Sequence, residues 1–468
     1  MQSVIKNYFS CDSMIEQSQI VGDIPSTKEM YKNAIDLAWP TAIERILVSL
    51  VNAMDTMMVG VLGSVAIASI GITQQPLLIV LAIIISLNVS VTAIVARRCG
   101  EKDFVAANNV LRQSIMLTFF ISIIIASIGY YFAPQLLMMM GADADILPGG
   151  TTYFRIVLLG MCFNSLSLNI TAAQRGAGNA KVSMYVNVVA NLVNLCLNFL
   201  LIEGRFGMPA LGVAGAGVAT VAGYVIAFSI AFGSILKKDS RLKLSKGDSW
   251  KPDVEIIKGI FGISNSALIE QMCMRLGFVM YVRLVTGLGT VAYATHQICT
   301  TLINMTFSIG EGISIAASSL VGRNMGANRS DMSIIYGKVC QRIGFVISST
   351  LLVVYILNRH SIMGLFTDEA EVIALGSTIV VFAAIAAPLQ TSQVIMAGAL
   401  RGAGDTKFIA KTSFLSVMLV RPAITFVCCN VLMLGLSGAW IGLIMDQVVR
   451  FALTSMRLSK GEWTTIAV

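Results

Sequence analysis

The sequence contains few charged residues. Asp, Glu, Lys and Arg make up 12% of its 468 residues, whereas a soluble globular chain carries about 25%. Hydrophobic residues make up 56%, and the mean hydropathy is +0.79. Polar surface is therefore too scarce to cover soluble domains, which excludes a soluble enzyme, a nucleic-acid-binding protein and a disordered chain. The composition predicts an integral membrane protein.

Histidine is also scarce, and the cysteines are not arranged for cross-linking. Two histidines, His296 and His360, exclude a histidine-based metal centre. The nine cysteines are odd in number and none is two or three positions from another, so neither a disulfide framework nor a zinc site is expected. No nucleophile, metal ligands or acid–base groups cluster along the chain. We therefore expect neither enzyme activity nor a cofactor.

Apolar stretches long enough to cross a bilayer recur along the chain. A spanning helix needs about 20 mostly apolar residues, and only helices are expected because backbone groups exposed to lipid must be satisfied internally. The alternating pattern of a membrane barrel is absent. The twelve predicted spans are 34–60, 70–95, 111–133, 150–173, 182–203, 211–236, 259–286, 293–320, 341–357, 373–399, 412–434 and 437–456.

Lysine and arginine are distributed unevenly between the two sides of these spans. If the N-terminus is cytoplasmic, the tail carries three and the even-numbered loops and the C-terminus carry 20, whereas the opposite loops hold only Arg205 and Arg359. By the positive-inside rule, both termini are predicted to be cytoplasmic. Residues 1–33 lack the features of a cleaved signal peptide and are expected to form a cytoplasmic tail, and 237–258 to form a basic cytoplasmic linker.

The second half of the sequence repeats the first. Adding 226 to a position in the first half gives its counterpart in the second, and near the end of the chain the shift falls to 223, which implies a short gap. Positions that coincide include Glu44 with Glu270, Arg97 with Arg323, and the Arg-Gly-Ala-Gly turn at Arg175 with that at Arg401. Because each copy holds six spans, the copies insert with the same orientation and are related by an axis along the membrane normal.

These observations predict an all-α integral membrane protein of two pseudo-symmetric lobes with six spans each. The N-lobe is expected at 34–236 and the C-lobe, with a short C-terminal tail, at 259–468. Two similar bundles that face each other leave a central cleft, which can open to either side of the membrane.

Several motifs of this chain resemble those of the multidrug and toxic compound extrusion (MATE) family, in its bacterial NorM/DinF-like branch. The resemblance covers the chain from about residue 30 to its end. It implies twelve helices in two lobes and efflux of organic cations in exchange for sodium ions or protons. The motifs are Val51-Asn-Ala-Met-Asp55-Thr-Met-Met-Val-Gly60, Asn194-Leu-Cys-Leu-Asn198, Pro209–Thr220, Ala294-Thr-His296-Gln297-Ile, the paired Arg-Gly-Ala-Gly turns and Gly435-Leu-Ser-Gly-Ala-Trp440.

Asp55 is the sharpest candidate for a functional residue. It lies in the outer half of the first span, and no basic residue occupies either adjacent helical turn. A desolvated, unpaired carboxylate must take up a proton or bind a cation, so Asp55 is a candidate ligand for sodium. The alternative is a structural role in which backbone donors satisfy the buried carboxylate.

Oxygen donors that could complete this site lie in the fifth and sixth spans. Asn194 and Asn198 are four residues apart and share a helix face, and Thr220 offers a hydroxyl group. In the resemblance, these residues and Asp55 match the N-lobe cation site. One branch of the family has a second aspartate at the position of Asn198, so the asparagine leaves proton coupling open. Hydrogen bonding between helices is an equally good explanation of the two asparagines.

The other acidic residues within the spans have weaker assignments. Glu44 and Glu270 occupy equivalent places in the two lobes, where they could serve coupling or lobe stability. In several branches of the family the C-lobe acids align with Met274 and Gln390, so that site is absent or rearranged here. Gln390 is kept as a candidate for coupling or a structural role. Asp446 and Arg450 lie four residues apart and are predicted to form a structural ion pair, which Arg421 could join. The possible lining of the substrate cavity comprises Met54, Met58, His296 and Gln297, with ordinary packing as the alternative.

The function that we expect is secondary active export of amphipathic organic cations by alternating access, coupled to sodium ions or protons. The expected location is the plasma membrane, and the expected state is a monomer that binds no nucleic acid. The main alternative is a flippase for a lipid-linked saccharide or another amphipathic lipid. A channel or a membrane-embedded enzyme would also be compatible with a multi-span chain, but the two-lobe repeat favours alternating access.

Overall fold

The computed structural model describes residues 8–60, 62, 64–237, 242–244 and 249–466. All regular secondary structure in these ranges is helical. The predicted tail and basic linker lie partly outside the described residues. The long helices are α2 (Thr27–Gly60), α3 (Ser64–Gly100), α4 (Phe104–Tyr131), α6 (Leu147–Gly176), α7 (Ala180–Leu201), α8 (Gly212–Leu236), α9 (Val254–Thr286), α10 (Thr290–Gly326), α11 (Ser330–Leu357), α13 (Ala370–Gly402) and α16 (Gly435–Lys460). The short ones are η1 (Cys11–Ser13), η2 (Gln17–Gln19), α5 (Ala133–Met139), η3 (Arg205–Gly207), α12 (Arg359–Gly364), α14 (Thr406–Ser413), η4 (Phe414–Val420), α15 (Arg421–Phe426), η5 (Val427–Val431) and η6 (Glu462–Thr465).

Each of the twelve predicted spans coincides with one of these helical segments, and four of them, 111–133, 182–203, 211–236 and 412–434, run one to three residues past a helix end. In the described part of the chain, ten helical segments are long and apolar enough to cross a membrane. The other two predicted spans lie in α2 and α9, which have 34 and 33 residues. At 1.5 Å per residue these helices are about 50 Å long, which suffices for a bilayer. The prediction of an all-helical protein with twelve membrane-spanning helices is confirmed.

The eleventh predicted span, 412–434, is not a regular α-helix. It consists of α14 and α15 with π-helical turns, η4 and η5, between and after them. Pro422 at the start of α15 has no N–H and cannot donate to the carbonyl four residues earlier. Wider π-turns lie on both sides of this proline and keep the chain helical, as they commonly do where the α-helical ladder is interrupted.

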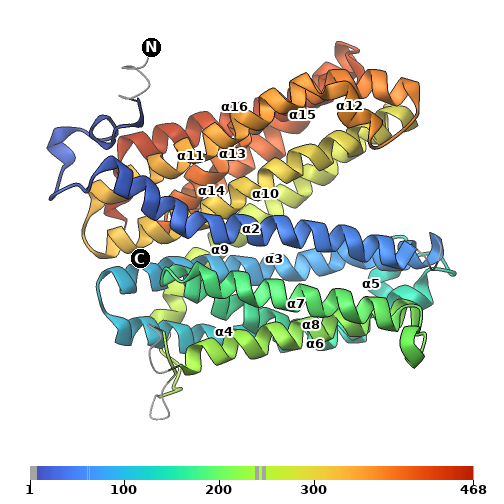
Figure 1. The fold of residues 1–468 in the computed structure, drawn as a ribbon, viewed down its shortest axis with the longest axis horizontal. Coiled ribbons are helices and arrows are strands. Elements are labelled where there is room, and N and C mark those ends of the chain that lie inside the picture. Colours follow the sequence, from blue (N-terminus) through green and yellow to red (C-terminus); the bar gives the residue numbers. More distant parts are fainter. Residues whose placement is uncertain (1–7, 61, 63, 238–241, 245–248, 467–468) are drawn as a thin grey trace. The chain divides into compact units, whose positions relative to one another are not determined.

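The chain divides into two compact units. One comprises residues 43–264 and the other residues 1–42 together with 265–468, so that the division falls inside α2 and inside α9. In the first unit, α6 packs against α3, α4, α7 and α8. In the second unit, α13 packs against α10, α11 and α16 (Figure 1). The predicted lobe boundaries at 34–236 and 259–468 stay predictions.

The repeat is visible in the local geometry of the two units. A Cβ on Gly176 would lie 2.7 Å from the carbonyl oxygen of Thr92, and a Cβ on Gly402 would lie 2.2 Å from that of Ser318. These four residues occupy equivalent positions in the two copies of the repeat. Only glycine permits this close approach of two helix backbones, which explains why the Arg-Gly-Ala-Gly turn recurs at the ends of α6 and α13.

Candidate functional site

Asp55 lies near the end of α2 and is partly buried. Its Oδ1 accepts a hydrogen bond of 2.8 Å from Nδ2 of Asn198 on α7. Among the described residues, no lysine or arginine forms a salt bridge with Asp55. The carboxylate is therefore satisfied by neutral donors, and its charge has no fixed counter-charge.

Asn194 lies one turn from Asn198 and completes the donors around the acid. With its amide nitrogen turned to Asp55, it donates to the two carboxylate oxygens at 3.1 and 3.2 Å, while its oxygen accepts from the N–H of Thr220 at 3.2 Å. We adopt this orientation because a carboxylate only accepts hydrogen bonds. Gly223 on α8 allows the close approach to α7, since a Cβ there would lie 3.3 Å from the Cβ of Asn194.

Two oxygen atoms beside the acid retain accepting capacity. Oδ1 of Asn198 is buried and has no hydrogen-bond partner in the described part of the chain. The Thr220 hydroxyl donates to the carbonyl oxygen of Ala216 at 2.9 Å, and its oxygen has two lone pairs with which to accept. The four residues predicted as a cation site thus come together from α2, α7 and α8, with acceptor oxygens around a single negative charge.

Two tyrosines near this group were not recognised from the sequence. Tyr153 on α6 lies within hydrogen-bond reach of Thr220 and within electrostatic range of Asp55. Tyr224 on α8 is also within electrostatic range of Asp55. Tyr224 follows Thr220 by four residues and so shares its helix face, a spacing that could have identified it. The sequence around Tyr153 carries no comparable signal.

The composition of the site determines which ions it suits. One carboxylate with neutral carbonyl and hydroxyl oxygens fits a monovalent hard cation or a proton. Within the described ranges, no three or more His, Cys, Asp or Glu side chains form a group that could hold a metal ion.

Glu44 and Glu270 both face an arginine of the Arg-Gly-Ala-Gly turn in their own unit. Oε1 of Glu44 lies 4.0 Å from Arg175 and accepts a hydrogen bond of 2.8 Å from Asn187. Glu270 forms a two-pronged ion pair with Arg401. Both glutamates therefore lie in positions suited to stabilising the bundle.

Asp446, Arg450 and Arg421 form a buried ionic cluster between α15 and α16. Oδ2 of Asp446 accepts from Arg450 at 2.9 Å and from both Nε and Nη2 of Arg421. A second side of Arg450 faces the sulfur of Met274 at 3.6 Å. Met274, where the resemblance would place an acid, is thus a packing partner of an arginine in this chain.

The remaining candidates are dispersed. His296 is buried between the rings of Tyr281 and Trp440, with centroid distances of 5.5 and 5.7 Å, whereas Gln297 is exposed. Gln390 is partly buried, and its Oε1 has no partner among the residues that the structure describes.

Met54 and Met58 occupy the same helix as Asp55 in different surroundings. Met54 is 44% exposed, and Met58 packs against the apolar core of its unit. Of the residues predicted to line a substrate cavity, Met54 and Gln297 are therefore exposed, whereas Met58 and His296 contact the interiors of their units.

Comparisons with known proteins agree with this architecture. The family model described as MatE matches the chain twice, over residues 40–200 and 267–427. The chain is 27% identical over 447 residues, 94% of both proteins, to the "Probable multidrug resistance protein NorM" of Thermotoga maritima. It is also 27% identical to the "Uncharacterized transporter YisQ" of Bacillus subtilis, over 91% of this chain and 94% of that protein.

A solved structure shares the fold over most of its length. Its title is "Outward-facing conformation of a multidrug resistance MATE family transporter of the MOP superfamily", and the TM-score is 0.86 at 21% identity, covering 92% of this chain and 97% of that one. Because the family model matches both halves of the chain, we conclude that this multi-pass membrane protein belongs to the MatE family of multidrug and toxic compound extrusion transporters.

Proposed function

We propose that this protein exports amphipathic organic cations across the plasma membrane in exchange for sodium ions or protons, by alternating access of its two lobes. The observation that carries the proposal is Asp55, an acid in a membrane-spanning helix that is held by amide groups and has no basic partner among the described residues. Acids within a membrane-spanning segment are energetically costly, and where they occur they mark the pathways of ions, protons or substrates.

The amide groups around Asp55 suit an acid that changes its charge. In the arrangement observed, Asn194 and Asn198 turn their nitrogens towards the carboxylate and stabilise its ionised form. A half-turn of a terminal amide would present its oxygen instead, and this torsion has a broad, two-fold energy profile. The same side chains could therefore coordinate a sodium ion. A protonated Asp55 could likewise donate to the free Oδ1 of Asn198.

Coupling follows if the preferred orientation of the lobes depends on the charge of Asp55. A bound sodium ion or proton neutralises the acid, and an organic cation held nearby loses its electrostatic partner and is released. Because the two cations compete for one charge, each lowers the affinity for the other. The cycle needs no covalent step, and we propose neither a catalytic residue nor a prosthetic group. We also propose that the protein acts as a monomer with both termini in the cytoplasm.

Dye efflux from proteoliposomes under separately imposed sodium and pH gradients tests this proposal. The Asp55→Asn variant should lose gradient-driven efflux and fall to the rate of protein-free vesicles. Asp36→Asn is the matched control, because Asp36 is an exposed acid on the same helix and should leave efflux unchanged. Gradient-driven efflux retained by Asp55→Asn, or lost equally in Asp36→Asn, would contradict the proposal.

A further inference from the structure

The segment that precedes α2 is folded against the helices of its own unit. Cys11 and Met14 are buried. The carbonyl oxygen of Met14 accepts a hydrogen bond of 2.6 Å from Nζ of Lys338 on α11, and the N–H of Val21 donates to Asp331 at 3.1 Å. These contacts fix residues 8–26 beside the first turns of α2.

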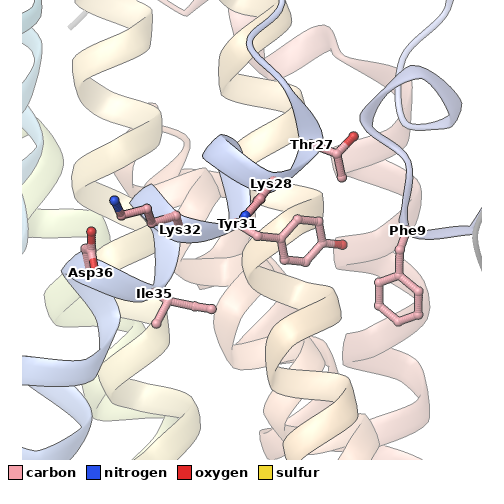
Figure 2. A pocket seen from close by; sticks show the side chains of 7 residues that line it. All are labelled: Phe9, Thr27, Lys28, Tyr31, Lys32, Ile35 and Asp36. Atoms are coloured by element: carbon pink, nitrogen blue, oxygen red, sulfur yellow. The ribbon is translucent and has the colours of Figure 1, made fainter.

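An open groove of about 700 Å³ lies between this segment and α2. Figure 2 shows Phe9 on one side, Ile35 on the other and the ring of Tyr31 between them. The rings of Phe9 and Tyr31 have centroids 6.3 Å apart. The wall of the groove is therefore predominantly apolar, although charged side chains from the first turns of α2 also line it.

The rim of the groove carries more positive than negative charge. Lys28 and Lys32 are exposed and lie four residues apart, on one face of the first turns of α2. Asp36 is the acid at the far end of the rim. Behind the aromatic wall, the guanidinium of Arg342 lies 4.2 Å from the ring centroid of Tyr8, which packs edge-on against Phe9. The positive N-terminal end of α2 adds to the same field.

The position of the groove along α2 places it where water meets hydrocarbon. The first predicted span begins at residue 34, so Lys28 and Lys32 precede the apolar stretch and Ile35 lies inside it. Trp39, one turn beyond Ile35, is 40% exposed, as is typical of aromatic side chains at the membrane interface. A ligand that fills this groove would need a negatively charged head and an apolar body.

We infer that the groove binds an anionic glycerophospholipid. Its phosphate lies between Lys28 and Lys32, and the first part of an acyl chain follows Ile35 and Phe9. Basic pockets beside spanning helices at the headgroup level bind anionic lipids in this way. The lipid joins the N-terminal segment to the start of the helix that carries Asp55. The binding does not depend on any transport activity, because all of its contacts lie outside the Asp55 site.

Native mass spectrometry of the full-length protein, titrated with phosphatidylglycerol in detergent, tests the inference. Lys28→Gln/Lys32→Gln should lower the affinity for the most tightly bound phosphatidylglycerol by roughly 30-fold, from two lysine–lipid contacts. Lys407→Gln/Lys411→Gln is the matched control, since these exposed lysines have the same spacing at the start of α14 but do not line the groove. The control pair should retain the affinity of the unaltered protein.

Phe9→Ala tests the contribution of the apolar wall to lipid binding separately from that of the two lysines. It should weaken phosphatidylglycerol binding a few-fold while the lysines stay in place, and thermal unfolding of each variant verifies that the fold is kept. Glycerol 3-phosphate should bind much more weakly than the lipid, because it lacks the acyl chains. Equal lipid affinity in Lys28→Gln/Lys32→Gln and the unaltered protein, an equal loss in the control pair, or glycerol 3-phosphate binding as tight as the lipid would each overturn the inference.

Discussion

Glu270 and Arg401 form, in the C-terminal half, the ion pair that Glu44 and Arg175 form at the equivalent positions of the N-terminal half. In both halves the acid lies near the middle of the first long helix, α2 or α9, and the arginine opens the Arg-Gly-Ala-Gly turn. The two copies differ in strength: Arg401 approaches Glu270 with two nitrogens, whereas Arg175 lies 4.0 Å from Glu44 and donates to Ser183 at 2.6 Å. Both halves of the repeat therefore contain the ion pair, but the pair in the C-terminal half should be the stronger of the two.

Neutralising the two glutamates should destabilise the protein unequally. Glu270→Gln removes the carboxylate that Arg401 contacts with two nitrogens in a partly buried setting, which should lower the free energy of unfolding by about 3 kcal/mol. Glu44→Gln keeps a hydrogen-bonding partner for Asn187 and leaves Arg175 bound to Ser183, so its cost should be about 1 kcal/mol. The loss of stability can be followed by thermal unfolding in detergent. Equal melting temperatures of the two variants would show that the pairs are energetically equivalent.

Neutralising the acid of the ionic cluster between α15 and α16 should destabilise the protein more than either glutamate substitution. Asp446→Asn removes the single carboxylate that Arg421 and Arg450 share, and it leaves two buried guanidinium groups facing each other. We expect a loss of about 4 kcal/mol or failure to accumulate in the membrane.

Glu203→Gln provides a control for the Asp446 prediction. Its ion pair with Arg205 lies at an exposed loop, and such pairs contribute little. Because several of the nine cysteines are buried, a thiol-reactive dye reports unfolding of both variants directly. A melting temperature of Asp446→Asn equal to that of Glu203→Gln would contradict the expected role of the cluster.

Periodicity and repetition made the fold predictable, but they did not determine the pairing of side chains. The lengths of the apolar stretches predicted all twelve spans. The shift of 226 between the two copies related Glu44 to Glu270 from the sequence alone. The sequence showed that Arg175 and Arg401 begin the two Arg-Gly-Ala-Gly turns, but it did not show that they pair with Glu44 and Glu270. Contacts between residues far apart in the sequence leave no local pattern. The position of Tyr153 beside Asp55 and Thr220 could not be predicted for the same reason. Asp55 and the three residues that lie beside it, Asn194, Asn198 and Thr220, could be singled out as candidates because polar groups in lipid are rare enough to stand out individually.

Helices α13 and α10 approach each other so closely at Gly402 that no side chain should fit there. A Cβ there would meet the carbonyl oxygen and Cα of Ser318 at 2.2 and 2.7 Å, so Gly402→Ala must push α13 away from α10 or distort its end. We expect a loss of about 2 kcal/mol, as is usual for overpacked cores. Gly262→Ala is the control, since nothing lies within 4 Å of its Cβ and a helix interior gains about 1 kcal/mol from alanine. The two variants should shift the melting temperature in opposite directions, and a shift in the same direction would refute the argument.

A second acid at position 198 should change the ion that the site prefers. Nδ2 of Asn198 lies 2.8 Å from Oδ1 of Asp55, so Asn198→Asp would place two carboxylates in contact. They cannot both stay ionised without a cation between them, and the variant should therefore bind sodium more tightly, by roughly tenfold for about 1.4 kcal/mol of added attraction. Sodium titration of efflux in proteoliposomes at constant pH measures the change. Asn198→Ala, which removes the amide without adding charge, should show no gain in sodium affinity. If both variants respond to sodium alike, the side chain at 198 does not contact the coupling ion, and Asp55 must act with other partners.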